Sequence, residues 1–328
     1  MDLTPDEFDD LVGAYALDAC EPDEVEAMER YIASDRAAAA EVERLREVAS
    51  GIGAAGASRP PVALLERLLQ SATERVTPVP ADEALQRETD RFDAFLDSLD
   101  ERDVEAPTEN GLTVRELVQH VEAVDRAFLA AADDPTVGYI GPDEVATITA
   151  TDLPTRVGEP FAESVTRFRR TRAVLGGLRE RLPADRRVAG YGRDNVLVVR
   201  AFETWTHHDD ARRALGKEIG LPDPEVMRTM ADLAMRSLPL ALAVRGTARP
   251  GLTARLVLEG PGGGEWSVPC APGETPSSRP DVVVRASVVE WCRRFADRMD
   301  ADAVAVSVDG DADLAHDLVR AANAFAGL

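Results

Sequence analysis

The sequence predicts an α+β protein of several domains: a small N-terminal helical domain, a four-helix bundle and a small C-terminal α+β sheet domain. Three observations lead to this prediction. Apolar residues recur at helical spacing over most of the first 244 residues. Beyond that point, short segments alternate between apolar and polar residues, as half-buried strands do. A chain of 328 residues is also longer than one domain usually needs.

Residues 1–52 are predicted to form the helical domain. Thr4 precedes several acidic residues and can cap a helix through "TPDEFDDLVGAYALDA". The stretch "EPDEVEAMERYIASDRAAAAEVERLREVASGIG" continues with apolar residues at helical spacing. We expect residues 53–81 to be a linker with one short helix from Val62 to about Val76, because "GIGAAGASRPP" and "TPVPA" are rich in helix-breaking residues.

Residues 82–220 contain four helical stretches, which predict an up-and-down bundle. The first is "EALQRETDRFDAFLDSLD". In the second, "LTVRELVQHVEAVDRAFLAAADD", Thr113 and Glu116 have the spacing of a capping box. The third is "EPFAESVTRFRRTRAVLGGLRERL", and the fourth runs from near Asp194 to Gly216. The segment "TVGYIGPDEVATITATDLP" is less regular, and no helix is predicted there.

Residues 221–328 begin with a helix through "DPEVMRTMADLAMRSLPLALAV" and continue with strands at "LTARLVLEG", "EWSVPC", "DVVVRAS" and "AVAVSVDG". The run "EGPGGGEW" is typical of a hairpin turn between the first two strands. Helices at "ASVVEWCRRFADRM" and "DADLAHDLVRAANAFAGL" flank the last strand. We therefore expect a small sheet backed by helices.

The composition narrows the classes of function. The formal net charge of −23 argues against nucleic acid or an anionic membrane as the main partner. No apolar run is long enough to span a bilayer, and the acidic N-terminus does not resemble a secretory signal, so we expect a cytoplasmic protein. Cys20, Cys270 and Cys292 form no metal-binding pair and are predicted to be small buried apolar residues. Lys217 is the only lysine, a bias that suggests a GC-rich, actinobacterial genome.

The chemistry is predicted to reside in histidines and a carboxylate of the bundle. His120 belongs to an otherwise apolar face of the second helix, and Glu203 and His207 project side by side from the fourth. Alone, a Glu–His pair four residues apart is usually a solvated contact, and a single core histidine is usually structural. Together, two imidazoles and one carboxylate from facing helices are a standard catalytic zinc set with an open fourth position.

The phrases "LTVRELVQHVEAVDRAF" and "ETWTHHDDARRALG" resemble the two signature stretches of the mycothiol-dependent maleylpyruvate isomerase family, metal-binding members of the DinB-like bundle superfamily. The resemblance implies that His120, Glu203 and His207 bind a divalent metal, usually zinc. This chain has Leu112 where the family often has tryptophan, and Asp209 where an aromatic residue is frequent. Both departures concern the pocket wall, and therefore the substrate rather than the metal.

Two further resemblances concern the flanking domains. Residues 221–328 resemble the second domain of the same enzymes, which is similar to a sterol-carrier fold. "LVGAYALDACEPDEVEAMERYIASDRAAAAEVERLRE" resembles the N-terminal domain of actinobacterial anti-sigma factors. Tyr31, Asp35 and Ala38 stand where the zinc-binding version of that domain carries its ligands, so this unit is expected to be held by apolar faces. The resemblance makes a sigma factor a possible partner.

The resemblance implies an enzyme that holds mycothiol, its co-substrate, as a metal-bound thiolate and needs no other cofactor. The thiolate would isomerise a conjugated cis double bond, or be transferred to a small electrophile. One alternative is a non-catalytic regulator that binds a sigma factor and senses metal, thiol or a small ligand in the bundle. Another is a bundle that keeps the ligand residues without metal.

Four other residues are candidates for supporting roles. His208 and Asp210 follow the ligand His207 and could orient it or meet the substrate, although His208 points about 100° away around the helix, toward an expected surface or edge. Arg245 and Arg285 could attract an anionic substrate. The remaining histidine, His316, is expected to be structural.

Overall fold

The structure is a computed structural model, and it describes residues 3–17, 19–20, 22–56, 76–218 and 220–324. The chain divides into two compact units, Met1–Leu65 and Glu66–Leu328. Helices and two sheets are both present, which confirms the predicted α+β class. The short helix predicted between Val62 and Val76 lies outside the described residues. The domain bounds after residues 52, 81 and 220 stay predictions.

The N-terminal unit consists of helices α1 (Pro5–Ala16), α2 (Pro22–Ser34) and α3 (Arg36–Gly56). Thr4 caps α1 as predicted, because its hydroxyl accepts from the Glu7 N–H while the Glu7 carboxylate accepts from the Thr4 N–H. Phe8 stacks on Tyr31 with ring centroids 5.0 Å apart, and Met28 is fully buried. α3 continues through residues 53–56, the first part of the expected linker, since isolated glycines lower helix stability by only about 1 kcal/mol each.

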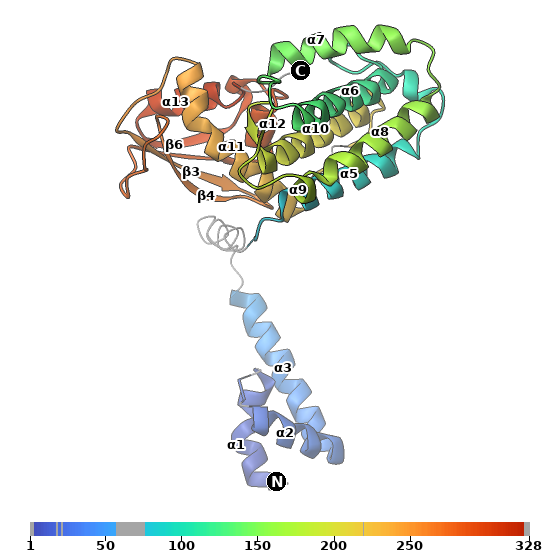
Figure 1. Cartoon of the computed structure of the whole chain (residues 1–328). Coiled ribbons are helices and arrows are strands. Elements are labelled where there is room, and N and C mark those ends of the chain that lie inside the picture. The colour runs from blue at the N-terminus through green and yellow to red at the C-terminus, as the bar shows by residue number, and fades with distance from the viewer. Residues whose placement is uncertain (1–2, 18, 21, 57–75, 219, 325–328) are drawn as a thin grey trace. The chain divides into compact units, whose positions relative to one another are not determined.

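Four long helices form the predicted bundle: α5 (Ala81–Leu96), α6 (Val114–Asp133), α8 (Phe161–Gly176) and α10 (Arg193–Ala214). In ring order α5 contacts α10, α10 contacts α6, α6 contacts α8, and α8 returns to α5 (Figure 1). The predicted capping box begins α6, where the Thr113 hydroxyl accepts from the Glu116 N–H at 3.2 Å. Because α6 and α10 are neighbours, residues on their facing sides can meet.

The segment between α6 and α8 contains a helix that the sequence analysis missed, α7 (Pro142–Asp152), which packs on α6. Pro142 occupies its first turn, and the Glu144 carboxylate accepts from the Gly141 N–H at 3.1 Å. None of its described side chains is fully buried, so it lacks the apolar stripe that would have predicted it. Short elements complete this region: η1 (Asp103–Glu105), η2 (Leu153–Arg156), α9 (Leu178–Arg181) and the hairpin β1 (Arg187–Val188) with β2 (Tyr191–Gly192).

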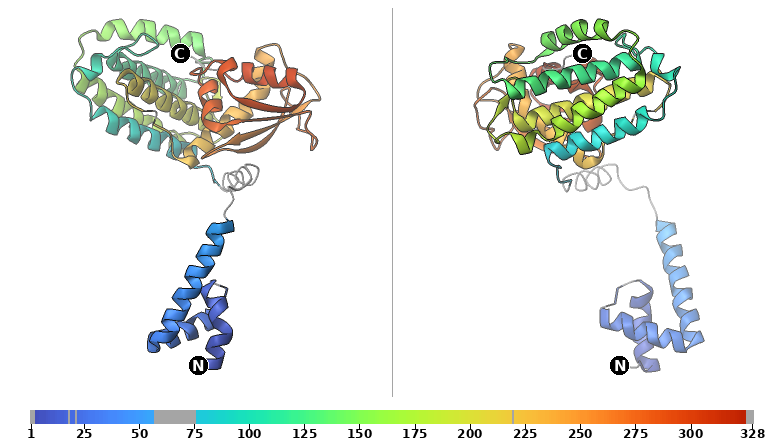
Figure 2. Two further views of the ribbon diagram at one scale, coloured as in Figure 1. Left: turned by 180° about the vertical axis from the view of Figure 1, so that it is seen from behind. Right: turned by 45° about the vertical axis from the view of Figure 1, so that its right-hand side comes forward.

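The rest of the unit confirms the predicted small sheet backed by helices. Strands lie in the order β4-β3-β5-β6, with β3 and β5 parallel and the outer pairs antiparallel. Alternate residues of β5 are buried, and helices pack on that side of the sheet (Figure 2). The elements are α11 (Pro224–Val244), β3 (Thr253–Glu259), β4 (Gly264–Pro269), β5 (Val282–Ser287), α12 (Val288–Phe295), η3 (Ala301–Ala303), β6 (Val306–Gly310) and α13 (Ala312–Ala321).

One continuous apolar core runs from the bundle into the sheet region. Phe202 of α10 packs on Phe295 of α12 with ring centroids 5.0 Å apart. Cys270 and Cys292 are buried in this core as predicted, whereas Cys20 is only half-buried. Among the described residues, no helix is both long and apolar enough to cross a membrane. The shared core fixes α10 against α11 and α12 on the side of the bundle that carries Glu203.

Candidate metal centre

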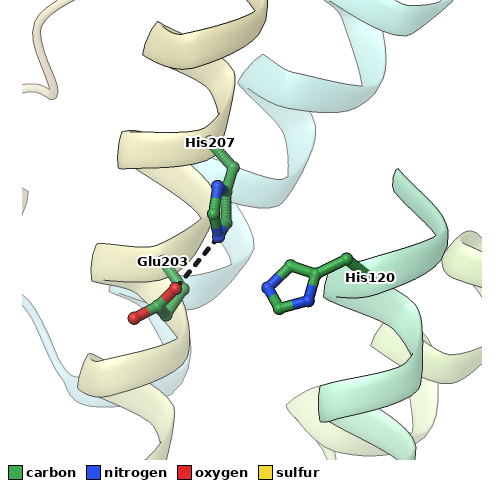
Figure 3. Close-up of side chains that lie close together, drawn as sticks. All are labelled: His120, Glu203 and His207. Carbon is green, nitrogen blue, oxygen red and sulfur yellow. Dashed lines mark ion pairs between the residues drawn. The ribbon is translucent and has the colours of Figure 1, made fainter. Parts of the chain in front are cut away.

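His120 of α6 and Glu203 and His207 of α10 meet inside the bundle. One potential ligand atom from each lies within 4.8 Å of the others, and they form the one such group among the described residues. The imidazole centroids are 5.1 Å apart, and the rings are nearly perpendicular. Figure 3 shows the three side chains pointing toward one another from the two helices. We call this group the trio.

The positions of these residues on their helices explain why they converge. Glu203 and His207 are one turn apart, so both project from the same side of α10. His120 lies among fully buried residues of α6, between Leu117 and Val124. Both histidine side chains have no exposed surface, whereas 23% of the Glu203 side chain is exposed. A small molecule therefore approaches the trio from the Glu203 side.

Thr149 of α7 assigns the tautomer of His120. The Thr149 hydroxyl donates to the Val145 carbonyl at 2.8 Å, so its oxygen is left to accept from the His120 Nδ1–H at 2.7 Å. With the proton on Nδ1, the His120 Nε2 carries a lone pair. That atom is buried and has no hydrogen-bond partner in the described part of the chain. A buried polar atom without a partner is uncommon and often marks a ligand site.

Asp210 has the same role for His207. Its carboxylate oxygen lies 3.2 Å from His207 Nδ1, which places an Nδ1–H there as donor. The His207 Nε2 lies 3.1 Å from a Glu203 carboxylate oxygen, yet the contact lacks hydrogen-bond geometry. When both rings are neutral, two imidazole lone pairs and a carboxylate converge here, an arrangement that favours a bound cation. The donor set, His2Glu, fits a catalytic zinc site with an open position.

The charges around the trio keep its carboxylate ionised. Burial raises the pKa of Glu203, but the close contact with His207 and the charges of His207, Arg200 and Arg298 outweigh it and lower the pKa to about 2. Burial lowers the pKa of His207, and the carboxylates of Asp210 and Glu203 more than reverse this, so it ends above its ordinary value. Burial and the nearby His207 hold the pKa of His120 well below its ordinary value. His120 is therefore the neutral imidazole of the pair.

A buried ionic cluster beside the trio escaped the sequence analysis. Asp125 has no exposed surface, and it accepts from Arg200 Nε at 2.6 Å and lies 2.5 Å from Arg172 Nε. Burial lowers the pKa of Arg172 to about 10, against the opposing effect of Asp125. One feature of the sequence could have indicated this cluster. Arg200 lies three residues before Glu203, on a helix that faces the core, and a buried arginine needs an acidic partner.

Arg298, which follows α12, is a second residue that the sequence analysis missed. Its guanidinium donates to both carboxylate oxygens of Asp210, at 2.9–3.1 Å. Arg298 and Asp210 are 88 residues apart in the sequence, so no local pattern could have paired them. The carboxylate that orients His207 is thus itself held by the sheet region of the chain.

The other predicted site residues are placed differently. The expectation that His208 lies at a surface or edge is wrong: it is buried against Phe92 and Phe95, because α5 covers that side of α10. Burial, and secondarily Arg91 and Arg212, lower its pKa to about 3. No described hydrogen bond joins His208 to His207.

The arginines that were expected to attract a substrate lie elsewhere. Arg245 donates to Asn323 at 3.1 Å and lines a separate cavity of about 830 Å³, beside the exposed His316. Arg285 is exposed in β5, opposite Ser307. Neither lines the cavity next to Glu203. Asp210 is therefore the one supporting candidate that the structure brings into contact with the trio.

The fold and the trio define a helical-bundle protein with a candidate three-ligand metal centre. Residues 85–212, which contain all three members of the trio, match the family model described as the mycothiol maleylpyruvate isomerase N-terminal domain. This region of the chain is therefore similar to the N-terminal domain of mycothiol maleylpyruvate isomerases.

The individual proteins that resemble this chain share less than 30% of their aligned residues with it. Two uncharacterised proteins of Mycobacterium tuberculosis, from strains CDC 1551 and H37Rv, are each 28% identical over 195 residues, which is 56% of this chain and 74% of theirs. Crystal structures of a mycothiol-dependent maleylpyruvate isomerase and of a histidine-to-alanine mutant share 23% and 20% identity, with TM-scores of 0.40 and 0.42. Each comparison covers 70% of this chain and 93% of the other. The likeness to this family therefore rests on the match of residues 85–212 to the family model.

Proposed function

We propose that this chain is a metal-dependent enzyme that uses a low-molecular-weight thiol, mycothiol, to isomerise a small unsaturated substrate. The observation that carries the proposal is the convergence of His120, Glu203 and His207 within the domain that the family model matches. The ligand types favour zinc. A divalent cation held there would stabilise the thiol in its deprotonated, nucleophilic form.

The protein's own residues prepare this site before any ligand arrives. Thr149 and Asp210 hold a proton on each Nδ1 and turn each Nε2 toward Glu203. Arg200 and Arg298 favour the ionised form of Glu203. The complete burial of both imidazoles limits water to the Glu203 side. Such pre-oriented groups need little rearrangement when the reaction begins.

The reaction that we propose conserves all atoms of the substrate. The thiolate sulfur forms a bond to one carbon of a conjugated cis double bond, and the electron pair moves into the conjugated group. The former double bond, now single, rotates. Expulsion of the same sulfur then restores the double bond in trans form and releases the thiol. Transfer of the thiol to an electrophile would stop after the first step and would consume one thiol per product.

Metal content is the first test. Protein purified without chelators or a histidine tag should carry about one zinc per chain by mass spectrometry. His120→Ala and Glu203→Ala should lose it, while His316→Ala, which changes an exposed histidine outside the trio, should keep it. Absence of metal in the wild type, with no uptake of added zinc, nickel or manganese, would refute the proposal.

The second test separates isomerisation from transfer. Metal-loaded protein is given mycothiol and conjugated cis-unsaturated acids that carry one or two carboxylates, and both product geometry and free thiol are followed. Trans product with constant thiol supports the isomerase, whereas loss of one thiol per product supports the transferase. Binding of a sigma factor by the N-terminal unit stays a prediction, and no described contact favours it.

A further inference from the structure

A cavity of about 250 Å³ opens beside Glu203. Its lining comes from α10, α11, the β1–β2 hairpin and the end of α12. Its volume is below the roughly 300–1,000 Å³ of pockets that take drug-sized ligands, so it suits a smaller molecule. Since Glu203 is the one exposed member of the trio, this cavity is the approach to the trio from solvent.

The inner wall of the cavity is apolar. Phe202 and Leu233 are almost fully buried, and Val199 and Phe295 are half-buried beside them. Among the described residues of the lining, Glu203 is the only carboxylate. An apolar molecule is stabilised against such a wall by about 25 cal/mol per Å² removed from water. A second negative charge placed beside Phe202 and Leu233 would instead meet Glu203 or hydrocarbon, both unfavourable.

Tyr139 forms a fixed aromatic part of the rim. Gly190 has φ +84°, and a Cβ built on it would lie 2.8 Å from the Tyr139 ring. Gly141 approaches the same ring even more closely, so a side chain at either glycine would displace Tyr139. The Tyr191 hydroxyl donates to the Tyr139 hydroxyl at 3.0 Å. The ring is therefore held in place by contacts on several sides.

Two exposed arginines line the same rim. Within the described ranges of the chain, Arg236 of α11 makes no hydrogen bond or ion pair, and Arg187 donates to the Gly190 carbonyl but to no carboxylate. This is notable in a chain with 60 acidic residues and a net charge of −23. A guanidinium binds a carboxylate strongly through paired hydrogen bonds. Arg236, with no partner of its own, is the side chain suited to that contact.

We propose that this cavity binds a small hydrophobic monocarboxylic acid. Arg236 contacts its carboxylate at the rim, the apolar body lies against Phe202 and Leu233, and the reactive end faces the trio. This assignment rests on the proposed function, because it takes the trio as the reaction centre. It predicts that a polar dicarboxylate is a poor ligand, since Arg187 and Arg236 are both at the rim and are the only cationic side chains among the described lining residues.

The test compares three probes of known charge. Phenylacetate, its neutral analogue phenylacetamide and the dicarboxylate succinate are titrated by calorimetry into zinc-loaded full-length protein. Phenylacetate should bind about 10-fold more tightly than phenylacetamide, the difference expected for a charge-assisted hydrogen bond, and more tightly than succinate. Arg236→Gln should reduce the phenylacetate preference to about 2-fold, and Arg236→Lys should keep most of it. Arg245→Gln, an exposed arginine of the other cavity, is the matched control.

Unchanged phenylacetate affinity in Arg236→Gln would overturn the inference, since the carboxylate would then bind elsewhere. Tighter binding of succinate would overturn it as well. Zinc content is measured on every sample, so the two proposals fail separately. If the protein binds no zinc but still binds phenylacetate more tightly than phenylacetamide, and Arg236→Gln reduces that preference, only the proposed function is refuted. Zinc-loaded protein without that preference refutes only the assignment of the acid.

Discussion

At the scale of single residues, the trio depends on two side chains that cannot themselves bind its metal. Thr149 and Asp210 each contact an Nδ1 and so determine which nitrogen of the imidazole carries the lone pair. A histidine with the wrong tautomer would direct an N–H at the position of the cation. Partners of this kind typically change metal affinity by roughly 10- to 100-fold.

Thr149→Val should therefore weaken zinc binding by about 10- to 100-fold. Valine keeps the shape of threonine but leaves the buried His120 Nδ1–H without an acceptor. The dissociation constant is measured by competition with a chromophoric chelator. Thr147→Val is the matched control, because Thr147 is exposed on the same helix and its hydroxyl makes the same bond to a backbone carbonyl four residues back. Equal affinities in the two variants would contradict the role of Thr149.

The sequence predicted the trio because each member has a periodic position on a helix. It also predicted Asp210 as a supporting residue, since a carboxylate three residues after a histidine lies within reach of it. Thr149, Asp125 and Arg298 could not be predicted in the same way. Their contacts to the site join different helices or distant parts of the chain, and helical spacing carries no information on such pairs.

At the scale of elements, the helices were predictable where capping and apolar spacing agree. Thr113 and Glu116 mark the start of α6, and the alternating pattern of 282–287 marks β5. α7 was missed because its described side chains form no buried stripe. The prediction that His208 lies at a surface was wrong because α10 is covered on several sides. A side chain that points about 100° away from His207 around the helix therefore meets α5 rather than solvent.

α5 carries a buried carboxyl whose titration should affect stability. Glu88 has no exposed surface, and burial raises its pKa above the ordinary 4.5, although Arg91 at 2.8 Å opposes the shift. The folded protein thus keeps this proton at pH values where the unfolded chain has released it. Stability should fall as pH rises from 4.5 through the folded-state pKa.

Glu88→Gln should remove this dependence. The free energy of unfolding of both proteins is measured with urea at several pH values. As pH rises through that window, the wild type should lose stability relative to the variant. Glu83→Gln, on the exposed part of the same helix, is the control. A difference that grows in favour of the wild type over this range would show that the Arg91 ion pair, rather than burial, dominates.

At the scale of the whole 66–328 unit, the sheet region takes part in building the metal centre. The apolar core is continuous from bundle to sheet, and Arg298 extends the contact to Asp210. Arg293 of α12 also faces α10, 3.7 Å from Asp209, but that carboxylate does not contact His207. The Arg298–Asp210 ion pair contacts the trio through His207, whereas the Arg293–Asp209 ion pair does not. Substituting each arginine therefore compares the two pairs.

Arg298→Gln should weaken zinc binding about 10-fold, because Asp210 loses the donor that fixes it against His207. Arg293→Gln should leave zinc affinity unchanged. In a double-mutant cycle, Asp210→Asn and Arg298→Gln should be non-additive, since both act through the same contact. Additive effects, or equal losses in the two arginine variants, would mean that the sheet region stabilises the bundle only in a general way.

The weak anchoring of α7 has a consequence for the rate at which a metal enters and leaves. A helix without a fully buried side chain detaches at a lower free-energy cost than the helices of a core. Detachment of α7 would separate Thr149 from His120 and free that ring to rotate, while Glu203 and His207 stayed on α10. We therefore expect the exchange rate of the bound ion to follow the local opening of α7, well before the bundle unfolds.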